Sequence, residues 1–132
     1  GRVLSHKANA LKQLPNVVFY GAVDPDRIPG FLRRFSAGII PFVINDQTAA
    51  IYPMKLNEYL LYGLPVVMTD FASLTDEEQF ARVANSGGFQ QALLEEIESD
   101  HIGKRLERQA KAINNSWEKK AIEFETILLR YA

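Results

Sequence analysis

The fold is decided by residues 38–69, which read GIIPFVINDQTAAIYPMKLNEYLLYGLPVVMT. The stretch begins and ends with short apolar runs, at 38–42 and 65–69, and both are continuous rather than alternating. Continuous apolar runs are expected of parallel strands that are covered on both faces. Between the runs, Leu56 and Leu60 recur at a helical step. The stretch therefore predicts a strand, a polar loop, a helix and a second strand parallel to the first.

The same pattern extends on both sides of this stretch. An apolar run at 17–20 predicts an earlier strand, and a weaker run at 80–84 predicts a later one. Apolar residues at steps of three and four predict a helix over 27–35. Alternating strands and helices with short connections imply right-handed crossovers. The expected fold class is α/β, a parallel sheet with helices on both faces.

The last third of the chain is predicted to be helical, over 87–99, 102–113 and 116–131. Gly87-Gly88 predicts a turn, and Asn114-Asn115-Ser116 a break between helices. Ser116 is expected to be the N-cap of the closing helix. Apolar residues recur along this helix at steps of three and four, at Trp117, Ala121, Phe124, Leu128 and Tyr131. The side chain of Trp117 is expected to lie in the core.

Composition excludes several classes of protein. The chain has 132 residues, enough for one domain, so we expect residues 1–132 to form a single domain. Its formal net charge of −1 gives no bulk attraction to nucleic acid. It has no cysteine, and His6 and His101 are far apart, so we expect no metal site. No apolar run approaches the roughly 20 residues of a membrane helix, and no signal peptide opens the sequence.

Ligands of open parallel sheets bind outside the carboxyl ends of the strands. There the chain has a polar loop, 43–52, which contains Asn45 and Thr48 and leads into the helix of residues 53–59. Pro53 suits the first helical position, and the free N–H groups of that turn form an anion site. Lys55 adds a positive charge suited to phosphate, and Glu58 could accept hydrogen bonds from sugar hydroxyls.

Purely structural roles explain many of these residues equally well. Lys55 and Glu58 are three apart, and spacing alone favours a surface ion pair. Gly63 reads as the end of a helix. Asp24 and Asp26 are predicted to form a turn and an N-cap for the helix over 27–35. Asp76, Glu77 and Glu78 are predicted to lie at the solvent-exposed start of a helix.

Several segments resemble bacterial glycosyltransferases of the GT-B fold, the large group-1 (family 4-like) class. The segments occur in the same order and at the same spacings as in that family. Residues 14–21 are similar to that family's LPNVxFxG segment, and residues 28–42 to LPxYLxxxDVxLIPF. Residues 53–67 are similar to PLKLxEYLAxGxPVV, and residues 115–118 to the SWxxR start of its last helix. The resemblance covers residues 14 to about 128.

The resemblance implies a Rossmann-like donor-binding domain, one half of a GT-B fold. The glutamate matching Glu58 holds the ribose hydroxyls of a UDP- or GDP-sugar, and the Lys55 position lies near the diphosphate. The other substrate-binding residues implied beside them are Asn45, Thr48, Pro53 and Met54. The implied function is transfer of a sugar from a UDP- or GDP-sugar to a glycan or lipid acceptor in polysaccharide biosynthesis. The nucleotide sugar is a substrate, and no cofactor or metal is expected.

The resemblance also sets expectations about the rest of the protein. The acceptor site and the catalytic base belong to an amino-terminal domain, and we expect residues 1–132 to be truncated at the amino terminus and inactive alone. We expect a cytoplasmic location, or one at the inner membrane face through peripheral association of the absent domain. The helix of residues 116–131 packs on that domain in the family.

Three residues depart from the family pattern. Ala50 stands where many members have a glutamate that touches the donor sugar, and Ala49 where close relatives often have an arginine. Tyr52 precedes the proline, where asparagine or serine is frequent. These departures keep a second hypothesis open, a non-catalytic module of the same fold that binds a nucleotide sugar or a partner.

Overall fold

The computed structural model describes residues 8–71, 80–85 and 87–131. The chain divides into two compact units, residues 1–34 and residues 35–132. The first unit contains α1 (Ala8–Leu11), the short 3₁₀ helix η1 (Pro25–Arg27) and α2 (Ile28–Leu32). The predicted roles of Asp76, Glu77 and Glu78 lie outside the described residues.

In the first unit, Asp24 is a capping residue, whereas Asp26 lies within η1 and is not the N-cap of α2. The Asp24 carboxylate accepts a hydrogen bond from the N–H of Asp26 at 3.0 Å and caps η1. The predicted helix over 27–35 is shorter than expected, because the chain leaves α2 through a tight turn in which the Arg34 N–H donates to the Phe31 carbonyl at 2.9 Å. Tyr20 packs edge to face on Phe31, with ring centroids 4.8 Å apart.

The predicted strand at residues 17–20 is wrong. The segment is not paired with any strand that the structure describes, and Val18 is 68% exposed. A strand is defined by its ladder of hydrogen bonds to a neighbour, and apolar composition alone does not supply that neighbour. The apolar run was therefore not sufficient to predict a strand, because it lacks the pairing that makes one.

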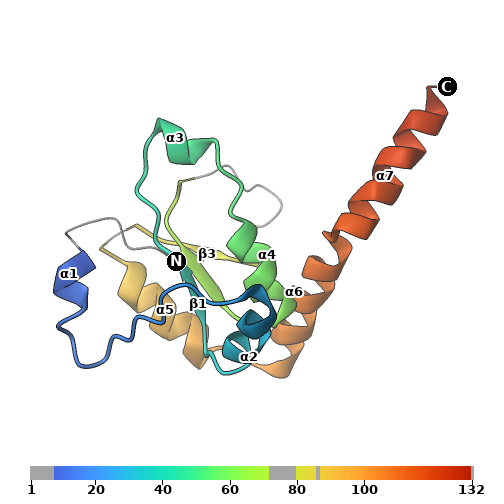
Figure 1. Cartoon of the computed structure of the whole chain (residues 1–132). Helices are drawn as coiled ribbons and strands as arrows, with labels where there is room; N and C mark the ends of the chain where they lie inside the picture. Colours follow the sequence, from blue (N-terminus) through green and yellow to red (C-terminus); the bar gives the residue numbers. More distant parts are fainter. Residues whose placement is uncertain (1–7, 72–79, 86, 132) are drawn as a thin grey trace. The chain divides into compact units, whose positions relative to one another are not determined.

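The second unit holds a parallel sheet of three strands (Figure 1). The strands are β1 (Gly38–Ile40), β2 (Val66–Met68) and β3 (Arg82–Val83), in the order β1-β2-β3. Gly38 is in register with Val66, and Val67 with Arg82. The three predicted strands of this unit are confirmed, including the weak one at 80–84.

In the described part of the second unit, two helices pack on this sheet, and a third packs on one of them. α4 (Met54–Leu61) packs against β1 and β2, α5 (Phe89–Glu98) packs against β2, and α6 (Ile102–Asn114) packs against α4 (Figure 1). The three helices predicted for the last third of the chain are confirmed to within two residues at each end. The unit also contains α3 (Asp46–Ala49) and α7 (Trp117–Arg130).

The core lies between α4 and the sheet. Leu56 and Leu60, the pair that predicted α4, are both fully buried, and Val66 and Met68 of β2 belong to the same cluster. All of β2 is buried, as predicted for a strand covered on both faces. In β1 the prediction holds for one face only, because the side chain of Ile39 points away from the buried neighbours and is 47% exposed.

Glycine is required where β1 meets α4. A Cβ atom on Gly38 would overlap the ring of Tyr59, which packs over the strand at that point. This close approach brings the helix onto the sheet. It also partly buries Tyr59, and this burial raises the pKa of its hydroxyl, against a smaller opposing effect of the Lys55 charge.

The carboxyl end of α4 is fixed by a buried arginine. Gly63 lies just past the C-cap with φ = +70°, and the N–H groups of Gly63 and Leu64 donate to the carbonyls of Leu60 and Tyr59. Arg108 of α6, only 4% exposed, donates to the Gly63 carbonyl at 2.7 Å and to the Asp100 carboxylate at 2.8 Å. One side chain thus ties the ends of α4 and α5 to α6.

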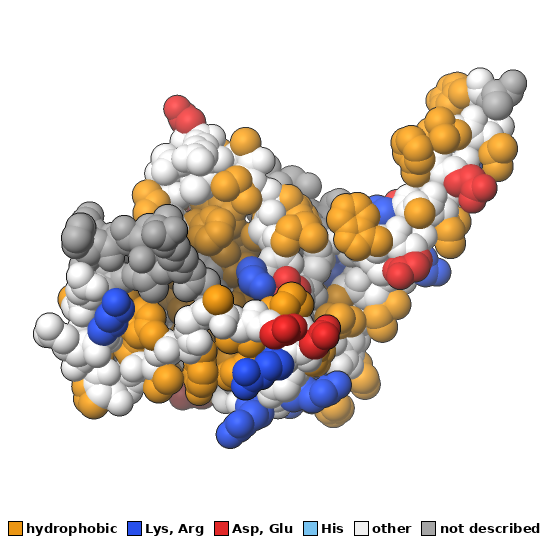
Figure 2. Space-filling model, viewed as in Figure 1, with side chains coloured by type: hydrophobic (Ala, Val, Ile, Leu, Met, Phe, Trp, Pro, Cys, Tyr) orange, Lys and Arg blue, Asp and Glu red, His pale blue; other side chains and the backbone are white. Residues whose placement is uncertain are grey.

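The closing helix α7 begins as predicted but packs differently. Ser116 is its N-cap, and its hydroxyl accepts a hydrogen bond from the Lys119 N–H. None of the described residues of α7 is buried, and hydrophobic side chains follow its length (Figure 2). The prediction that Trp117 lies in the core is wrong, since its side chain is 78% exposed. The described residues provide no surface that covers this stripe.

Candidate functional site

The polar loop that follows β1 is folded around a short helix. Asn45 and Thr48 form a reciprocal capping box on α3: the Asn45 amide oxygen accepts from the Thr48 N–H at 2.9 Å, and the Thr48 hydroxyl oxygen accepts from the Asn45 N–H at 3.0 Å. The Thr48 hydroxyl also donates to the Val43 carbonyl at 2.6 Å. The side chains of these two predicted site residues therefore stabilise the loop itself.

The base of this loop is held at the carboxyl edge of the sheet. Thr69 follows β2, and its hydroxyl donates to the Phe42 carbonyl at 2.6 Å. The rings of Phe42 and Phe71 pack with centroids 4.8 Å apart. The residues that leave β1 and β2 are thus bound to each other, so the loop starts from the edge where ligands of open parallel sheets bind.

The loop leads into α4, whose first turn carries the remaining predicted residues. α4 begins at Met54, so the buried Pro53 is the N-cap residue rather than the first helical residue as predicted. The Leu56 N–H donates to the Pro53 carbonyl at 2.8 Å. The N–H groups of Met54 and Lys55 precede that bond, and helix geometry gives them no partner within the helix.

Lys55 and Glu58 form the ion pair that their spacing predicted. Lys55 Nζ lies 2.6 Å from Glu58 Oε2, and the side chains are 53% and 42% exposed. No hydrogen bond or ion pair among the described residues joins this pair to Asn45 or Thr48. The structure therefore brings the predicted residues together as two pairs, one in the loop and one on α4.

A groove borders the start of α4. It has a volume of about 650 Å³ and runs between α4 and the junction of α6 with α7. Met54, Glu58 and Leu61 line it from α4, and Ile113 and Trp117 line it from the other side. The sequence placed Trp117 in the core and gave no reason to expect it at a groove. Its position depends on where the chain turns between α6 and α7, which local spacing does not determine.

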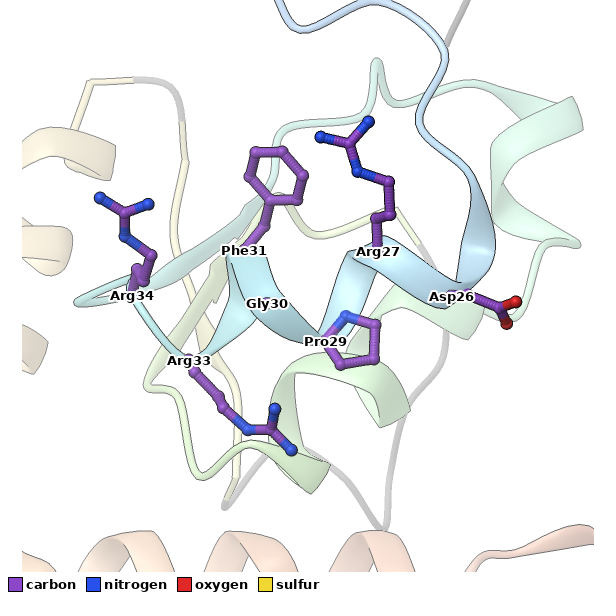
Figure 3. Close-up of a pocket in the computed structure, with 7 residues that line it drawn as sticks. All are labelled: Asp26, Arg27, Pro29, Gly30, Phe31, Arg33 and Arg34. Carbon is purple, nitrogen blue, oxygen red and sulfur yellow. The ribbon is translucent and has the colours of Figure 1, made fainter.

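A second hollow, of about 500 Å³, lies in the first unit and is lined by charged residues of the η1–α2 segment (Figure 3). Arg27, Phe31 and Arg34 point to one side of this segment, and Arg33 points to the other. Because the three arginines do not converge, the hollow does not offer the cluster of cations expected of a phosphate site. The sequence did not single out these arginines.

The described part of the chain holds neither a cluster of metal ligands nor a membrane span. No group of three or more histidine, aspartate or glutamate side chains in this part of the chain is placed to hold a metal ion. None of the helices over residues 8–71, 80–85 and 87–131 has the length and apolar character needed to span a bilayer.

Comparison with known proteins identifies the class of protein. The family described as glycosyl transferases group 1 matches residues 2–99, which include the sheet, the loop and α4. This chain belongs to that family. A stretch of 63 residues is 38% identical to the Bacillus subtilis (strain 168) protein named "Putative teichuronic acid biosynthesis glycosyltransferase TuaH". The stretch is 48% of this chain and only 16% of that relative. No solved structure matches the chain.

Proposed function

We propose that this chain is the donor-binding part of a glycosyltransferase and binds a UDP- or GDP-sugar at the start of α4. The observation that carries the proposal is the pair of Lys55 and Glu58, which lies next to the loop at the carboxyl edge of the sheet. Membership of the group 1 family supports glycosyl transfer as the reaction class.

The two side chains suit the two halves of a nucleotide diphosphate. Lys55 is a mobile point charge, and the N–H groups at the start of α4 add donors, so this end favours the diphosphate. Glu58 is an acceptor that would hold the two ribose hydroxyls. Pro53 and Met54 would shape the first turn around the phosphates, and Asn45 and Thr48 would hold the loop in place for the sugar.

The donor site would stabilise the leaving diphosphate without a metal. Fixed N–H dipoles and the Lys55 ammonium supply positive potential where negative charge develops on the diphosphate as its bond to the anomeric carbon of the sugar breaks. The acceptor and the catalytic base would come from an amino-terminal domain. The matched stretch is only 16% of the curated relative, which leaves room for such a domain in a protein of that length. The name of that relative supports a role in polysaccharide biosynthesis, and the acceptor proposed for that role is a glycan or a lipid.

A non-catalytic binding module of the same fold is the second candidate. Ala49 and Ala50 end α3 where family members carry an arginine and a glutamate, so this loop offers no charged side chain to the donor sugar at those positions. Such a module would bind the nucleotide part and transfer nothing.

A thermal-shift and calorimetry screen of UDP, GDP, ADP and their sugars tests the proposal. We expect saturable binding of UDP or GDP and their sugars, with ADP weaker. Binding of none of them would refute the proposal. Sugar transfer by a longer protein that contains this chain would decide for the enzyme, and binding without transfer would decide for the module. We expect no transfer by residues 1–132 alone.

A further inference from the structure

Three polar side chains form a closed network beside the candidate site. Tyr52 ends the loop, Asn57 lies on α4, and Asn115 caps the carboxyl end of α6. The Asn57 amide donates to the Tyr52 hydroxyl at 3.1 Å, and the hydroxyl donates back to the Asn57 amide oxygen at 3.3 Å. The Asn115 amide donates to both, at 3.0 Å to the hydroxyl and 3.0 Å to the amide oxygen.

The network uses the full capacity of the Tyr52 hydroxyl, which has one proton to donate and two lone pairs that accept. Asn115 lies 63 residues from Tyr52 and 58 from Asn57 in the chain. The two bonds from Asn115 are therefore tertiary contacts that fasten the loop and α4 to the α6–α7 junction. Tyr52 is also one of the three residues at which the sequence departs from the family pattern.

The position of the network ties it to the residues proposed to bind the donor. Tyr52 directly precedes Pro53, the N-cap of α4, and Asn57 lies between Lys55 and Glu58. Asn115 directly precedes Ser116, the N-cap of α7. All three network residues line the groove of about 650 Å³ that also contains Glu58 and Trp117. A displacement of α7 that moves Asn115 would therefore pull on the start of α4.

We infer that Tyr52, Asn57 and Asn115 are positioning residues that fix the start of α4 and couple it to the beginning of α7. The predicted effect on donor affinity rests on the proposed function; the coupling between the two segments does not. The side chains of the Lys55–Glu58 pair are about half exposed, so the placement of the pair depends on how firmly the helix under it is held. The network supplies that support from a distant part of the chain.

Tyr52→Phe tests the inference, because it removes one hydroxyl and keeps the ring. Loss of hydrogen bonds of ordinary strength should weaken UDP or GDP binding about threefold to tenfold in calorimetry. Tyr131→Phe is the matched control, since Tyr131 is 88% exposed and lies at the end of α7. We expect it to bind as the unmodified chain does. If Tyr52→Phe also leaves the affinity unchanged, the positioning role is wrong.

A double variant separates a network from three independent contacts. Asn115 and Tyr52 are hydrogen-bonded to each other and both are hydrogen-bonded to Asn57. The double variant Tyr52→Phe/Asn115→Ala should therefore lose little more nucleotide affinity than the single variant with the larger loss. Additive losses would contradict a shared network.

Hydrogen exchange followed by mass spectrometry measures the coupling between the start of α4 and the beginning of α7 without any ligand. Tyr52→Phe should speed exchange at the start of α4 and also at residues 113–118. Faster exchange near residue 52 alone would overturn the coupling. If the unmodified chain binds no nucleotide, the proposed function fails, and the exchange experiment still decides whether the network couples the two segments.

Discussion

The Nζ atom of Lys55 lies 2.6 Å from Oε2 of Glu58, one turn further along α4. Because both side chains are about half exposed, water and salt screen the pair, which contributes at most about 1 kcal/mol to stability. A ligand that offered phosphate oxygens to Lys55 and hydroxyl groups to Glu58 would separate the pair at a small cost. The ion pair is therefore compatible with a binding role for both residues.

Lys55→Ala should weaken binding of the nucleoside diphosphate more than binding of the bare nucleoside. The Lys55 ammonium attracts the phosphates by charge, and the nucleoside has none. Calorimetry with UDP and uridine, or with GDP and guanosine, measures the difference in one variant. Equal losses for the two ligands would show that Lys55 does not meet the phosphates.

Gly38→Ala should destabilise the second unit by about 1–3 kcal/mol, the usual cost of overpacking a core. The added Cβ would overlap the ring of Tyr59 and push α4 from the sheet. Urea unfolding measures the effect. Gly30→Ala is the control, since a Cβ on Gly30 meets no atom within 4 Å. A Gly38→Ala chain as stable as the control would mean that α4 does not pack on β1 as described.

Arg108→Ala should lower the free energy of unfolding by about 3–5 kcal/mol, as expected when one partner of a buried ion pair is removed. It would leave the Gly63 carbonyl and the buried carboxylate of Asp100 short of a donor. Arg105→Ala is the matched control, because Arg105 binds the same carboxylate at 2.7 Å from a side chain that is 55% exposed. Similar effects of the two changes in urea unfolding would contradict the buried role of Arg108.

Asp100 should make stability depend on pH in the acid range. Burial is the largest single influence and favours the neutral carboxyl, but the hydrogen bonds and charges of Arg108 and Arg105 together outweigh it and hold the pKa of Asp100 below its usual value. The stabilisation is therefore complete above the unfolded value of about 3.9 and is lost as pH falls through the lower folded-state pKa.

Thermal unfolding measures the pH-dependent stabilisation by Asp100 when the unmodified chain and Asp100→Asn are compared between about pH 2.5 and 7. This range extends roughly one unit or more on either side of the unfolded-state pKa. The gap in melting temperature between the two should be widest at neutral pH and should narrow in acid. A gap that stays constant over the range would contradict the assignment.

The sequence predicted the parts of the fold that depend on local pattern. The spacing of Leu56 and Leu60 predicted α4, Ser116 predicted the start of α7, and continuous apolar runs predicted β1 and β2. Each of these features depends on residues within one or two turns or on a single short run. The strand expected at 17–20 failed because strand pairing depends on a partner from elsewhere in the chain.

The candidate site was predictable only in part, for the same reason. Lys55 and Glu58 were found because both lie on one helix at a spacing of three residues. The hydrogen bonds of Asn115 to Tyr52 and Asn57 join residues about 60 positions apart, and no local sequence pattern predicts them. The exposure of Trp117 likewise depends on the course of α7.

The affinity of Glu58→Ala for UDP and GDP, measured by calorimetry beside its melting temperature, tests the donor-site proposal most directly. Glu123→Ala is the matched control, since Glu123 forms an exposed pair with Lys120 at the same spacing on α7, at 3.0 Å. We predict that Glu58→Ala weakens nucleotide binding at least about tenfold, the loss expected when a charged acceptor of two hydroxyl groups is removed. Its melting temperature should stay close to that of the control. Unchanged binding together with a melting temperature lowered by many degrees would show that Glu58 is structural and would contradict the proposal.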